Sequence, residues 1–398
     1  MITIRQNDKK IKEKISNDYQ SLSLYVDKEL VSYLIYTYNY DKTIIDQIYT
    51  YPKYRRKGYA LRLLNKLEII SVYNRIEVEL QQSDDSTDSF FSKYFEKENN
   101  KFILNRVKTD LHIHLGGVPA TLKSNSQEFN ISIEQVANYI KESHITHACI
   151  LYTNYDQLEK LSNLLPNVKL YGLQYYDIGM HNTLFDDQKF DSDKPLWKGI
   201  KIHSHRNYSI NQIINYSTKG LLSSLFHKLP NNSIILPHFQ GSLGSHPLDL
   251  MNNMNNYMNH KFIIGHGGTY GFMTYKPTIE KDKFDLNKQN LFYLYLTSLN
   301  SVTVAVNLAN EMPNVWLDSS IFTVHKNIIF NNCENSGFGS DYPLGMMKDH
   351  FLQKQETLYC NSFNKNIHLN SIHTRTIKFL ESSIEERMNI FFERNKKC

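Results

Sequence analysis

The stretch TDLHIHLGG at residues 109–117 decides the fold of the larger part of this chain. Apolar and polar residues alternate along it, and His112 and His114 are two positions apart. Side chains two apart in a strand point to the same side, so the stretch predicts a buried strand with both imidazoles on one face. Two adjacent imidazoles repel each other when protonated, and each needs a partner when neutral. A shared metal ion would satisfy both, so the pair indicates a metal site.

Seven further strand-like runs follow, separated by helical or loop segments. They are THACILY (146–152), VKLYGLQYY (168–176), KGIKIH (198–203), SIILPHF (233–239), KFIIGHG (261–267), NVWLDSS (314–320) and SGFGSDYP (336–343). Eight strands with connecting segments over about 290 residues are the number expected for a (β/α)8 TIM barrel, an α/β fold. We therefore expect residues 107–398 to form such a barrel and residues 1–106 to form a separate, smaller domain.

Residues at the carboxyl ends of these strands are the candidate site, because chemistry in such barrels takes place at that end. They are His112, His114, Lys201, His203, His238, His266 and Asp341. Imidazoles together with a carboxylate form a nitrogen and oxygen ligand set suited to Zn²⁺, Mn²⁺, Fe²⁺ or Co²⁺, with water in an open position. A single histidine is more often a surface residue, and an H-x-H pair alone is weak evidence. It is the ordered recurrence at successive strand ends that favours a metal site.

Residues 1–106 have the pattern of a small α+β domain. Two strand-like runs around a turn at Asp27 and Lys28 are followed by a third run, a helix, another strand and a short amphipathic helix at 89–97. The junction YPKYRRKGYALRLL (51–64) places a strand end, a basic glycine turn and a helix start in succession. Consecutive backbone amides and the positive end of a helix can hold a pyrophosphate there. Such a turn can also be no more than a well-solvated helix start.

This junction resembles the acetyl-CoA-binding motif of the GCN5-related N-acetyltransferase (GNAT) family, R/Q-x-x-G-x-G/A, at Arg55, Gly58 and Ala60. The resemblance implies that the loop binds acetyl-CoA, that Tyr94 protonates the departing thiolate, and that Asp46 is the nearest candidate base. The loop residues are Arg55, Arg56, Lys57, Gly58, Tyr59 and Ala60. The helical arm that normally shapes the amine site is much reduced here. The domain is therefore either an acetyltransferase or a fold that has lost catalysis.

The barrel motifs resemble those of the amidohydrolase superfamily, and more closely its amidohydrolase-related branch, also called amidohydrolase 2. The matching pieces are TDLHIHLGG, GIKIHSH, LPHFQG, IIGHGG, VWLDSS, GFGSDYP and the terminal SIEERMNIFFERN. The residues that the resemblance implies as ligands of one metal ion are His112, His114, His238 and Asp341. His266 would be an acid, base or electrostatic group. Lys201 would line the pocket with His203, bind an anionic group of the substrate or, once carboxylated, bridge a second metal.

The resemblance implies a metal-dependent hydrolase that cleaves an amide, lactone or related ester bond of a small polar molecule with metal-activated water. Asp341 would take the proton of the water, and His266 would steady the oxyanion or protonate the leaving group. Two other activities stay open. One is non-oxidative decarboxylation of an unsaturated or aromatic acid, for which Arg206 is the nearest carboxylate-binding candidate, and the other is a bifunctional acetyltransferase and hydrolase. A non-catalytic scaffold would have a broken ligand set, whereas every ligand position here is filled.

The composition of the chain limits the classes of binding partner that we expect. A net charge of +5 over 398 residues gives no expectation of nucleic acid or an anionic membrane as a partner. The charged start of the sequence lacks the apolar segment of a secretory signal peptide, and no apolar run is long enough to span a bilayer. The 4 scattered cysteines fit a reducing compartment. We therefore expect a cytoplasmic enzyme with a small-molecule substrate and acetyl-CoA as partners, while assembly into a homo-oligomer stays open.

Overall fold

The structure is a computed structural model, and the chain divides in it into two compact units. One unit is Met1–Lys108 with Phe363–Ile372, and the other is Thr109–Ser362 with His373–Cys398. The residues that the structure describes are 2–79, 85–99, 101–116, 131–177, 190–203, 221–239, 246–268, 300–320, 333, 335–342 and 368–395. Each unit is described below by itself. The division of the chain at residues 106 and 107 stays a prediction.

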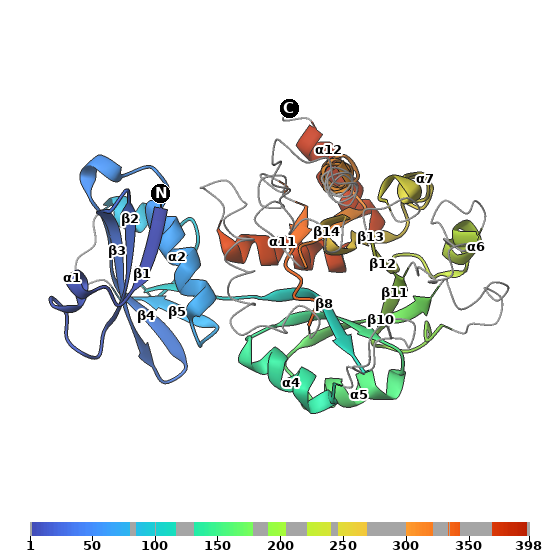
Figure 1. Cartoon of the computed structure of the whole chain (residues 1–398), viewed down its shortest axis with the longest axis horizontal. Helices are drawn as coiled ribbons and strands as arrows, with labels where there is room; N and C mark the ends of the chain where they lie inside the picture. Colours follow the sequence, from blue (N-terminus) through green and yellow to red (C-terminus); the bar gives the residue numbers. More distant parts are fainter. Residues whose placement is uncertain are drawn as a thin grey trace, which may run out of the picture. The chain divides into compact units, whose positions relative to one another are not determined.

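The first unit is built on a seven-stranded sheet with the order β1-β2-β3-β4-β5-β7-β6. Strands β1 to β5 are labelled in Figure 1. Its strands are β1 Ile2–Gln6, β2 Gln20–Val26, β3 Glu29–Asn39, β4 Lys42–Thr50, β5 Arg75–Val78, β6 Glu96–Glu98 and β7 Lys101–Asn105. Strands β4 and β5 pair in parallel, and the other neighbouring pairs are antiparallel. The predicted turn at Asp27 and Lys28 joins β2 to β3, and both residues have the positive φ that tight hairpins require, 46° and 73°.

Helix α2, Tyr59–Ile70, covers one face of this sheet. Its leucines at helical spacing are buried and share a core with apolar side chains of β2, β3, β4 and β5. Two short helices, α1 Lys9–Lys12 and α3 Asp85–Phe91, and the 3₁₀ turn η1, Pro52–Tyr54, belong to the same unit. The prediction of a helix at 89–97 was placed too late in the sequence. Residues 96–98 pair with β7 instead, which leaves Tyr94 in the turn after α3.

Residues from near the end of the chain complete this first unit. His368 is buried against the carboxylate of Glu68 on α2, and its ring lies 4.9 Å from that of Tyr94. The backbone N–H of Leu369 donates to Asn65 Oδ1 over 3.1 Å. The sequence analysis had assigned this segment to the barrel.

The second unit is a parallel barrel of eight strands in the order β8-β9-β10-β11-β12-β13-β14-β15. The strands are β8 Thr109–Leu115, β9 His147–Tyr152, β10 Lys169–Asp177, β11 Trp197–His203, β12 Ile234–Pro237, β13 Lys261–Ile264, β14 Val315–Asp318 and β15 Ser336–Gly337. The last strand returns to the first, because Leu111 N–H donates to Phe338 O and His114 N–H donates to Tyr342 O, each over 2.9 Å. The barrel is thus nearly closed, which confirms the predicted fold class.

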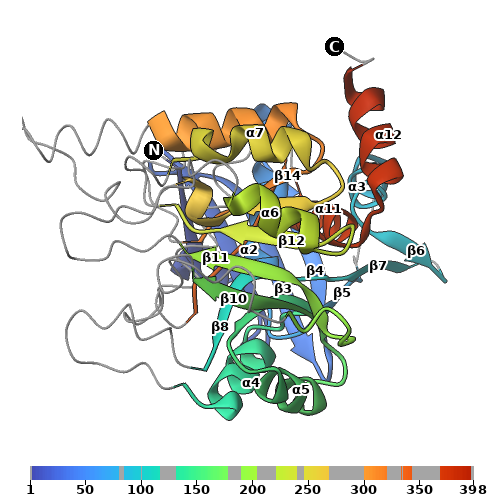
Figure 2. The ribbon, with the colours of Figure 1, turned by 90° about the vertical axis from the view of Figure 1, so that its right-hand side faces the viewer.

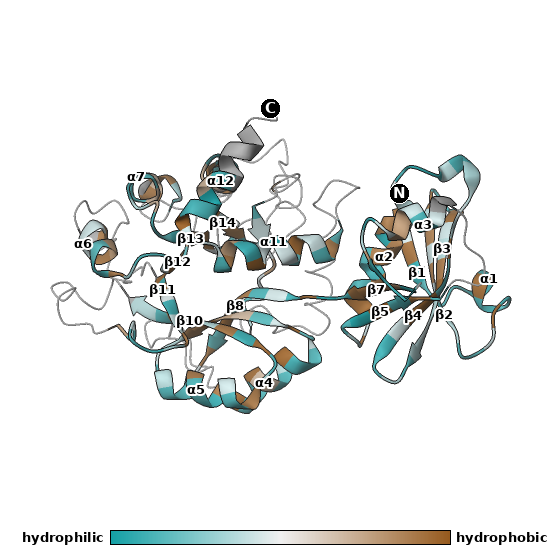
Figure 3. Ribbon diagram, turned by 180° about the vertical axis from the view of Figure 1, so that it is seen from behind, coloured by the Kyte–Doolittle hydropathy of each residue, from teal (hydrophilic) through white to brown (hydrophobic). Residues whose placement is uncertain are grey.

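The described helices of this unit are amphipathic and lie outside the strands, as α4 and α5 show (Figure 2). Among them are α4 Ile133–Glu142, α5 Tyr155–Leu164, α6 Leu221–Lys228, α7 Leu248–Asn256, α12 Ile384–Asn395, and α11 Leu369–Glu381, which begins in the first unit and continues into this one. Figure 3 shows hydrophobic and hydrophilic residues interleaved along α4 and α5, and α4 buries Val136, Tyr139 and Ile140. Ser132 and Gln135 form a capping box at its start.

One apolar cluster joins side chains from β8, β9, β10, β12, β13 and β14 with two residues of α11. Its members are Leu111, Cys149, Leu151, Tyr171, Leu173, Tyr175, Ile234, Leu236, Ile263, Trp316, Phe379 and Leu380. The polar strand ends described next lie beyond this packed layer. Among the helices of the described residues, none has the length and apolar character needed to cross a membrane.

Candidate metal centre

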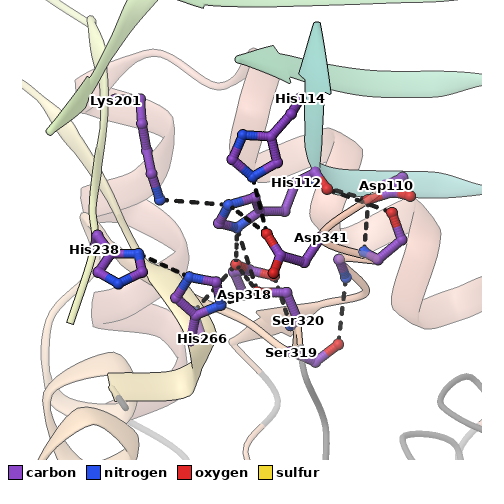
Figure 4. Close-up of polar contacts among 12 residues, drawn as sticks. Asp110, His112, His114, Lys201, His238, His266, Asp318, Ser319, Ser320 and Asp341 are labelled. Atoms are coloured by element: carbon purple, nitrogen blue, oxygen red, sulfur yellow. Dashed lines mark hydrogen bonds and ion pairs between the residues drawn. The ribbon is translucent and has the colours of Figure 1, made fainter. Parts of the chain in front are cut away.

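Six strands of the barrel bring their polar carboxyl ends together in one buried cluster (Figure 4). His112 and His114 come from β8, Lys201 from β11, His238 follows β12, His266 follows β13, Asp318 ends β14 and Asp341 follows β15. All seven side chains are buried. The residues predicted from the strand ends therefore do lie side by side, wherever the structure describes them.

Three ligand atoms converge on one side of His112. Asp341 Oδ1 lies 2.9 Å from His114 Nε2 and 3.3 Å from His112 Nε2. The three residues could hold a metal ion, since their ligand atoms are all within 4.8 Å of one another. Among the described residues, Asp341 Oδ2 and His114 Nδ1 have no hydrogen-bond partner although both atoms are buried. A buried carboxylate oxygen without a donor is unfavourable, so these residues fit a cation.

Burial controls the protonation of this group. Burial lowers the pKa of His114, against the opposing effect of Asp341. A neutral imidazole has a lone pair to offer, and metal ligation requires that form. The pKa of Asp318 is raised by burial but lowered more by His112 and by the hydrogen bonds from His112 and Ser320, so the net shift is downward and the carboxylate is ionised.

The other side of His112 faces Asp318. His112 Nδ1 lies 2.6 Å from Asp318 Oδ2, and the same oxygen accepts from the His266 N–H at 3.2 Å. Ser320 Oγ donates to that oxygen over 2.6 Å and lies 2.8 Å from His266 Nδ1. His112, His266 and Asp318 form a second group whose ligand atoms could hold a metal ion. In this group, however, the polar atoms already satisfy one another.

His238 and His266 face each other. His266 Nε2 lies 2.9 Å from His238 Nδ1. The two groups that could hold a metal do not include His238, so its role as a ligand stays a prediction. His266 and Asp341 both have positive φ, 55° and 57°. Such strained backbone in residues other than glycine is concentrated at functional sites.

Lys201 is fully buried, with Nζ 3.4 Å from His112 Nε2. Burial lowers its pKa to about 8, against the opposing effect of Asp318 and Asp341. Its place beside the ligand group fits either of the predicted roles, substrate binding or bridging a second metal. The side chain of His203 and the whole of Arg206 lie outside the described residues.

Sequence analysis missed three polar residues of the centre. Asp318 and Ser320 are in the quoted VWLDSS run, and Asp318 ends a strand as the predicted ligands do, which was the available signal. Asp110 accepts from the N–H groups of His112 (3.0 Å) and Ser340 (2.9 Å) and thereby ties β8 to the end of the barrel. Burial raises the pKa of Asp110 to about 6.

The predicted acetyl-CoA loop lies at the start of α2. Gly58 has φ 75° there, a conformation that glycine adopts without strain, and the side chains of Arg55, Arg56 and Lys57 are exposed. Tyr59 and Ala60 form the first turn of the helix. A helix start surrounded by cations suits a pyrophosphate.

The two predicted acetyl-transfer residues have shifted pKa values. Tyr94 packs against Phe90 and His368, and burial raises the pKa of its hydroxyl. Asp46 is the extra residue of a bulge in β4, opposite the step from Ile35 to Tyr36. Burial, and then Glu79, raise its pKa.

The fold and the cluster together define a GNAT-type domain joined to a parallel barrel with a buried histidine and aspartate centre. Residues 4–95 match the sequence profile of the acetyltransferase (GNAT) family. This match confirms the predicted GNAT-like domain. Among curated proteins, none matches the sequence.

Three solved structures illustrate the similarity. The PaiA N-acetyltransferase from Thermoplasma acidophilum in complex with coenzyme A is 19% identical, with a TM-score of 0.20, and the match covers 23% of this chain and 62% of that one, under two thirds of its length. A GNAT family acetyltransferase from Elizabethkingia anophelis with acetyl-CoA bound is 14% identical, with a TM-score of 0.22 and coverage of 26% and 95%. A probable 2-pyrone-4,6-dicarboxylic acid hydrolase from Acinetobacter baumannii with citric acid bound is 12% identical, with a TM-score of 0.42 and coverage of 69% and 99%.

Proposed function

We propose that the barrel is a metal-dependent hydrolase that cleaves an amide, lactone or related ester bond of a small polar molecule. The observation that supports this is the convergence of His112 Nε2, His114 Nε2 and Asp341 Oδ1, beside a buried Asp341 Oδ2 that has no donor among the described residues. Protein ligands of this kind with one position left open are the pattern of a catalytic metal site. His238 is the proposed further ligand.

The donor set of imidazoles and carboxylate suits Zn²⁺. A divalent ion held there supplies Lewis acidity, which lowers the pKa of water and polarises a carbonyl. Asp341 Oδ2 accepts the proton that water gives up as its oxygen adds to the carbonyl carbon. The Lys201 ammonium stabilises the negative charge that develops on the carbonyl oxygen. The proton that Asp341 has taken up then passes to the leaving nitrogen or oxygen as the bond between that atom and carbon breaks, with His266 as the proposed group that hands it on.

Metal content tests this proposal. The protein is purified without added metal, as wild type, His112→Ala and Asp341→Ala, and analysed for its elements. We expect about one equivalent of a transition metal in the wild type and none in the two variants, because each variant removes one of three converging ligands. His227→Ala is the matched control, since His227 is exposed on α6, and it should keep the wild-type content.

Absence of metal from the wild type, even after reconstitution with Zn²⁺, would contradict the hydrolase proposal. About two equivalents would instead implicate Lys201 as the bridge to a second ion. With the metal established, lactones, amides and unsaturated acids are the substrates to screen.

We further propose that the N-terminal domain binds acetyl-CoA through Arg55, Arg56, Lys57, Gly58, Tyr59 and Ala60. The family match over residues 4–95 and the exposed basic start of α2 support this. For acetyl transfer, Tyr94 is the proposed acid and Asp46 the proposed base. The raised pKa of Asp46 suits a group that must take a proton near neutral pH.

A further inference from the structure

Asp318 makes four polar contacts through its two carboxylate oxygens. It is fully buried at the end of β14. Its Oδ2 receives His112 Nδ1 at 2.6 Å, Ser320 Oγ at 2.6 Å and the His266 N–H at 3.2 Å, and its Oδ1 receives the Ser320 N–H at 2.8 Å. An ionised carboxylate can only accept hydrogen bonds. His112 Nδ1 therefore carries a proton, and a neutral His112 has its lone pair on Nε2.

The direction of the next hydrogen bond follows from the serine. Ser320 has one hydroxyl proton, and donating it to Asp318 Oδ2 avoids two acceptors facing each other at 2.6 Å. Towards His266 Nδ1, 2.8 Å away, the hydroxyl oxygen must therefore accept, so His266 carries its proton on Nδ1. Tautomers are assigned from such networks.

The same reasoning reaches His238. With its proton on Nδ1, a neutral His266 has a lone pair on Nε2 and accepts from His238 Nδ1 over 2.9 Å. His238 is then protonated on Nδ1, and its lone pair is on Nε2. His112 and His238, two of the proposed ligands, thus present the same nitrogen.

We propose that Asp318 is a positioning residue that fixes the tautomer of His112 directly, and those of His266 and His238 through Ser320, before a metal binds. The proposal rests on the metal site proposed above. A carboxylate behind a ligating imidazole orients the ring and raises its basicity. His114 gives the contrast, because no carboxylate lies behind its ring: its Nδ1 has no hydrogen-bond partner among the described residues, and its Nε2 lies 2.9 Å from Asp341 Oδ1, itself a proposed ligand atom.

Glycine at position 339 is part of this arrangement. A Cβ at Gly339 would lie 1.9 Å from Asp318 Oδ1 and 3.1 Å from the Cβ of His112. The backbone after β15 therefore packs directly on the carboxylate and holds it against the imidazole. An exchange of Asp318 for asparagine keeps the size but turns an amide N–H₂ towards one of the donors.

The test is the tautomer of each histidine in the metal-free, full-length protein, measured by ¹⁵N spectroscopy of labelled imidazoles and assigned by histidine substitutions. In the wild type we expect His112, His266 and His238 to be protonated on Nδ1. Asp318→Asn should give His112 a mixed or Nε2-protonated spectrum. Ser320→Ala should leave His112 protonated on Nδ1, because this atom lies 2.6 Å from Asp318 Oδ2 and 3.3 Å from Ser320 Oγ, and it should free the tautomers of His266 and His238. It serves as a second variant should Asp318→Asn not fold.

Asp110→Asn is the matched control, because Asp110 is equally buried but binds backbone N–H groups and the Tyr139 hydroxyl rather than imidazoles. It should keep all three tautomers. Zinc affinity, measured by competition with a chelator, should fall by about 10 to 100-fold in Asp318→Asn and much less in the control.

An unchanged His112 spectrum in Asp318→Asn would overturn the proposal, and so would an equal change in Asp110→Asn, which would indicate general distortion. An unchanged His266 in Ser320→Ala would overturn the path through the serine. If the wild type binds no metal, the proposed hydrolase fails, while the tautomers measured without metal still decide the role of Asp318.

Discussion

A lysine is buried at the start of β13, outside the metal centre. Lys261 is 2% exposed, and its Nζ donates to Leu380 O over 2.5 Å. Burial, and then the charge of Arg387, lower its pKa to about 7, against the opposing effect of Glu381 and Glu386. A lysine in the unfolded chain keeps its proton up to the ordinary value of 10.5. The position therefore couples folding to pH.

We expect the free energy of unfolding to rise with pH between about 7 and 10 because of Lys261. In that window the unfolded chain binds a proton at this residue that the folded chain has lost. Lys261→Met removes the coupling, so its stability relative to wild type should fall by about 2–4 kcal/mol across the window. Urea unfolding at several pH values measures this.

The matched control is Lys378→Met, which removes an exposed lysine from α11. Its stability should follow the wild-type pH dependence. Parallel pH curves for the wild type and Lys261→Met would mean that the buried amine stays protonated in the folded chain.

Some residues of the metal centre could be predicted from the sequence, and the contacts of others could not. His112 and His114 could be placed because a strand alternates its side chains, and Asp341 because it follows the last of the eight strand-like runs. Asp318 has the same sequence signal, yet its role depends on contacts with residues 206 and 52 positions earlier in the chain. No local pattern encodes such contacts. The strand end at Asp318 could therefore be predicted, but the residues that Asp318 binds could not.

At the scale of elements, the start of α2 makes the acetyl-CoA proposal testable. Arg55 and Arg56 are exposed, so reversing their charges should leave the fold intact. Arg55→Glu with Arg56→Glu should weaken coenzyme A binding by roughly 10-fold or more, because a helix start that favours anions then carries two anions itself. Isothermal titration of the full-length protein with coenzyme A measures this.

Lys9→Glu with Lys10→Glu changes the net charge equally on α1 and is the control, which should bind within about threefold of wild type. Equal losses of coenzyme A affinity in both double variants would show that the effect comes from the overall charge of the protein and not from a binding site at the start of α2. If the wild type does not bind coenzyme A, the proposal that this domain binds acetyl-CoA is wrong.

Most elements could be predicted because their apolar spacing is strong. The strands of the barrel before β15 were marked by short apolar runs, and α2 by leucines at helical spacing. Helix α3 was placed late because aromatic residues 90–95 have a helical pattern, although Phe95 lies beyond the helix and packs on Phe91. Pairing of 96–98 with β7 overrides the local preference.

For the whole molecule, the sequence predicted two domains in order but not that the chain returns to the first unit near its end. Residues Phe363–Ile372 belong to that unit. Their partners on α2 are about three hundred positions earlier, and periodicity in the sequence does not predict contacts at such a separation. The first unit is therefore complete only when the far end of the chain is present.

His368→Ala tests this dependence. The substitution leaves Glu68 buried without its imidazole and opens a space beside Tyr94, which should destabilise the first unit by about 1–3 kcal/mol. Amide hydrogen exchange followed by peptide reports each unit separately, so peptides covering α2 and β7 should exchange faster while those covering α4 and α5 do not change. His227→Ala, an exposed histidine of α6, should alter neither set. Faster exchange across both units would show that the two unfold together, and unchanged exchange in α2 would show that the first unit is stable without the returning segment.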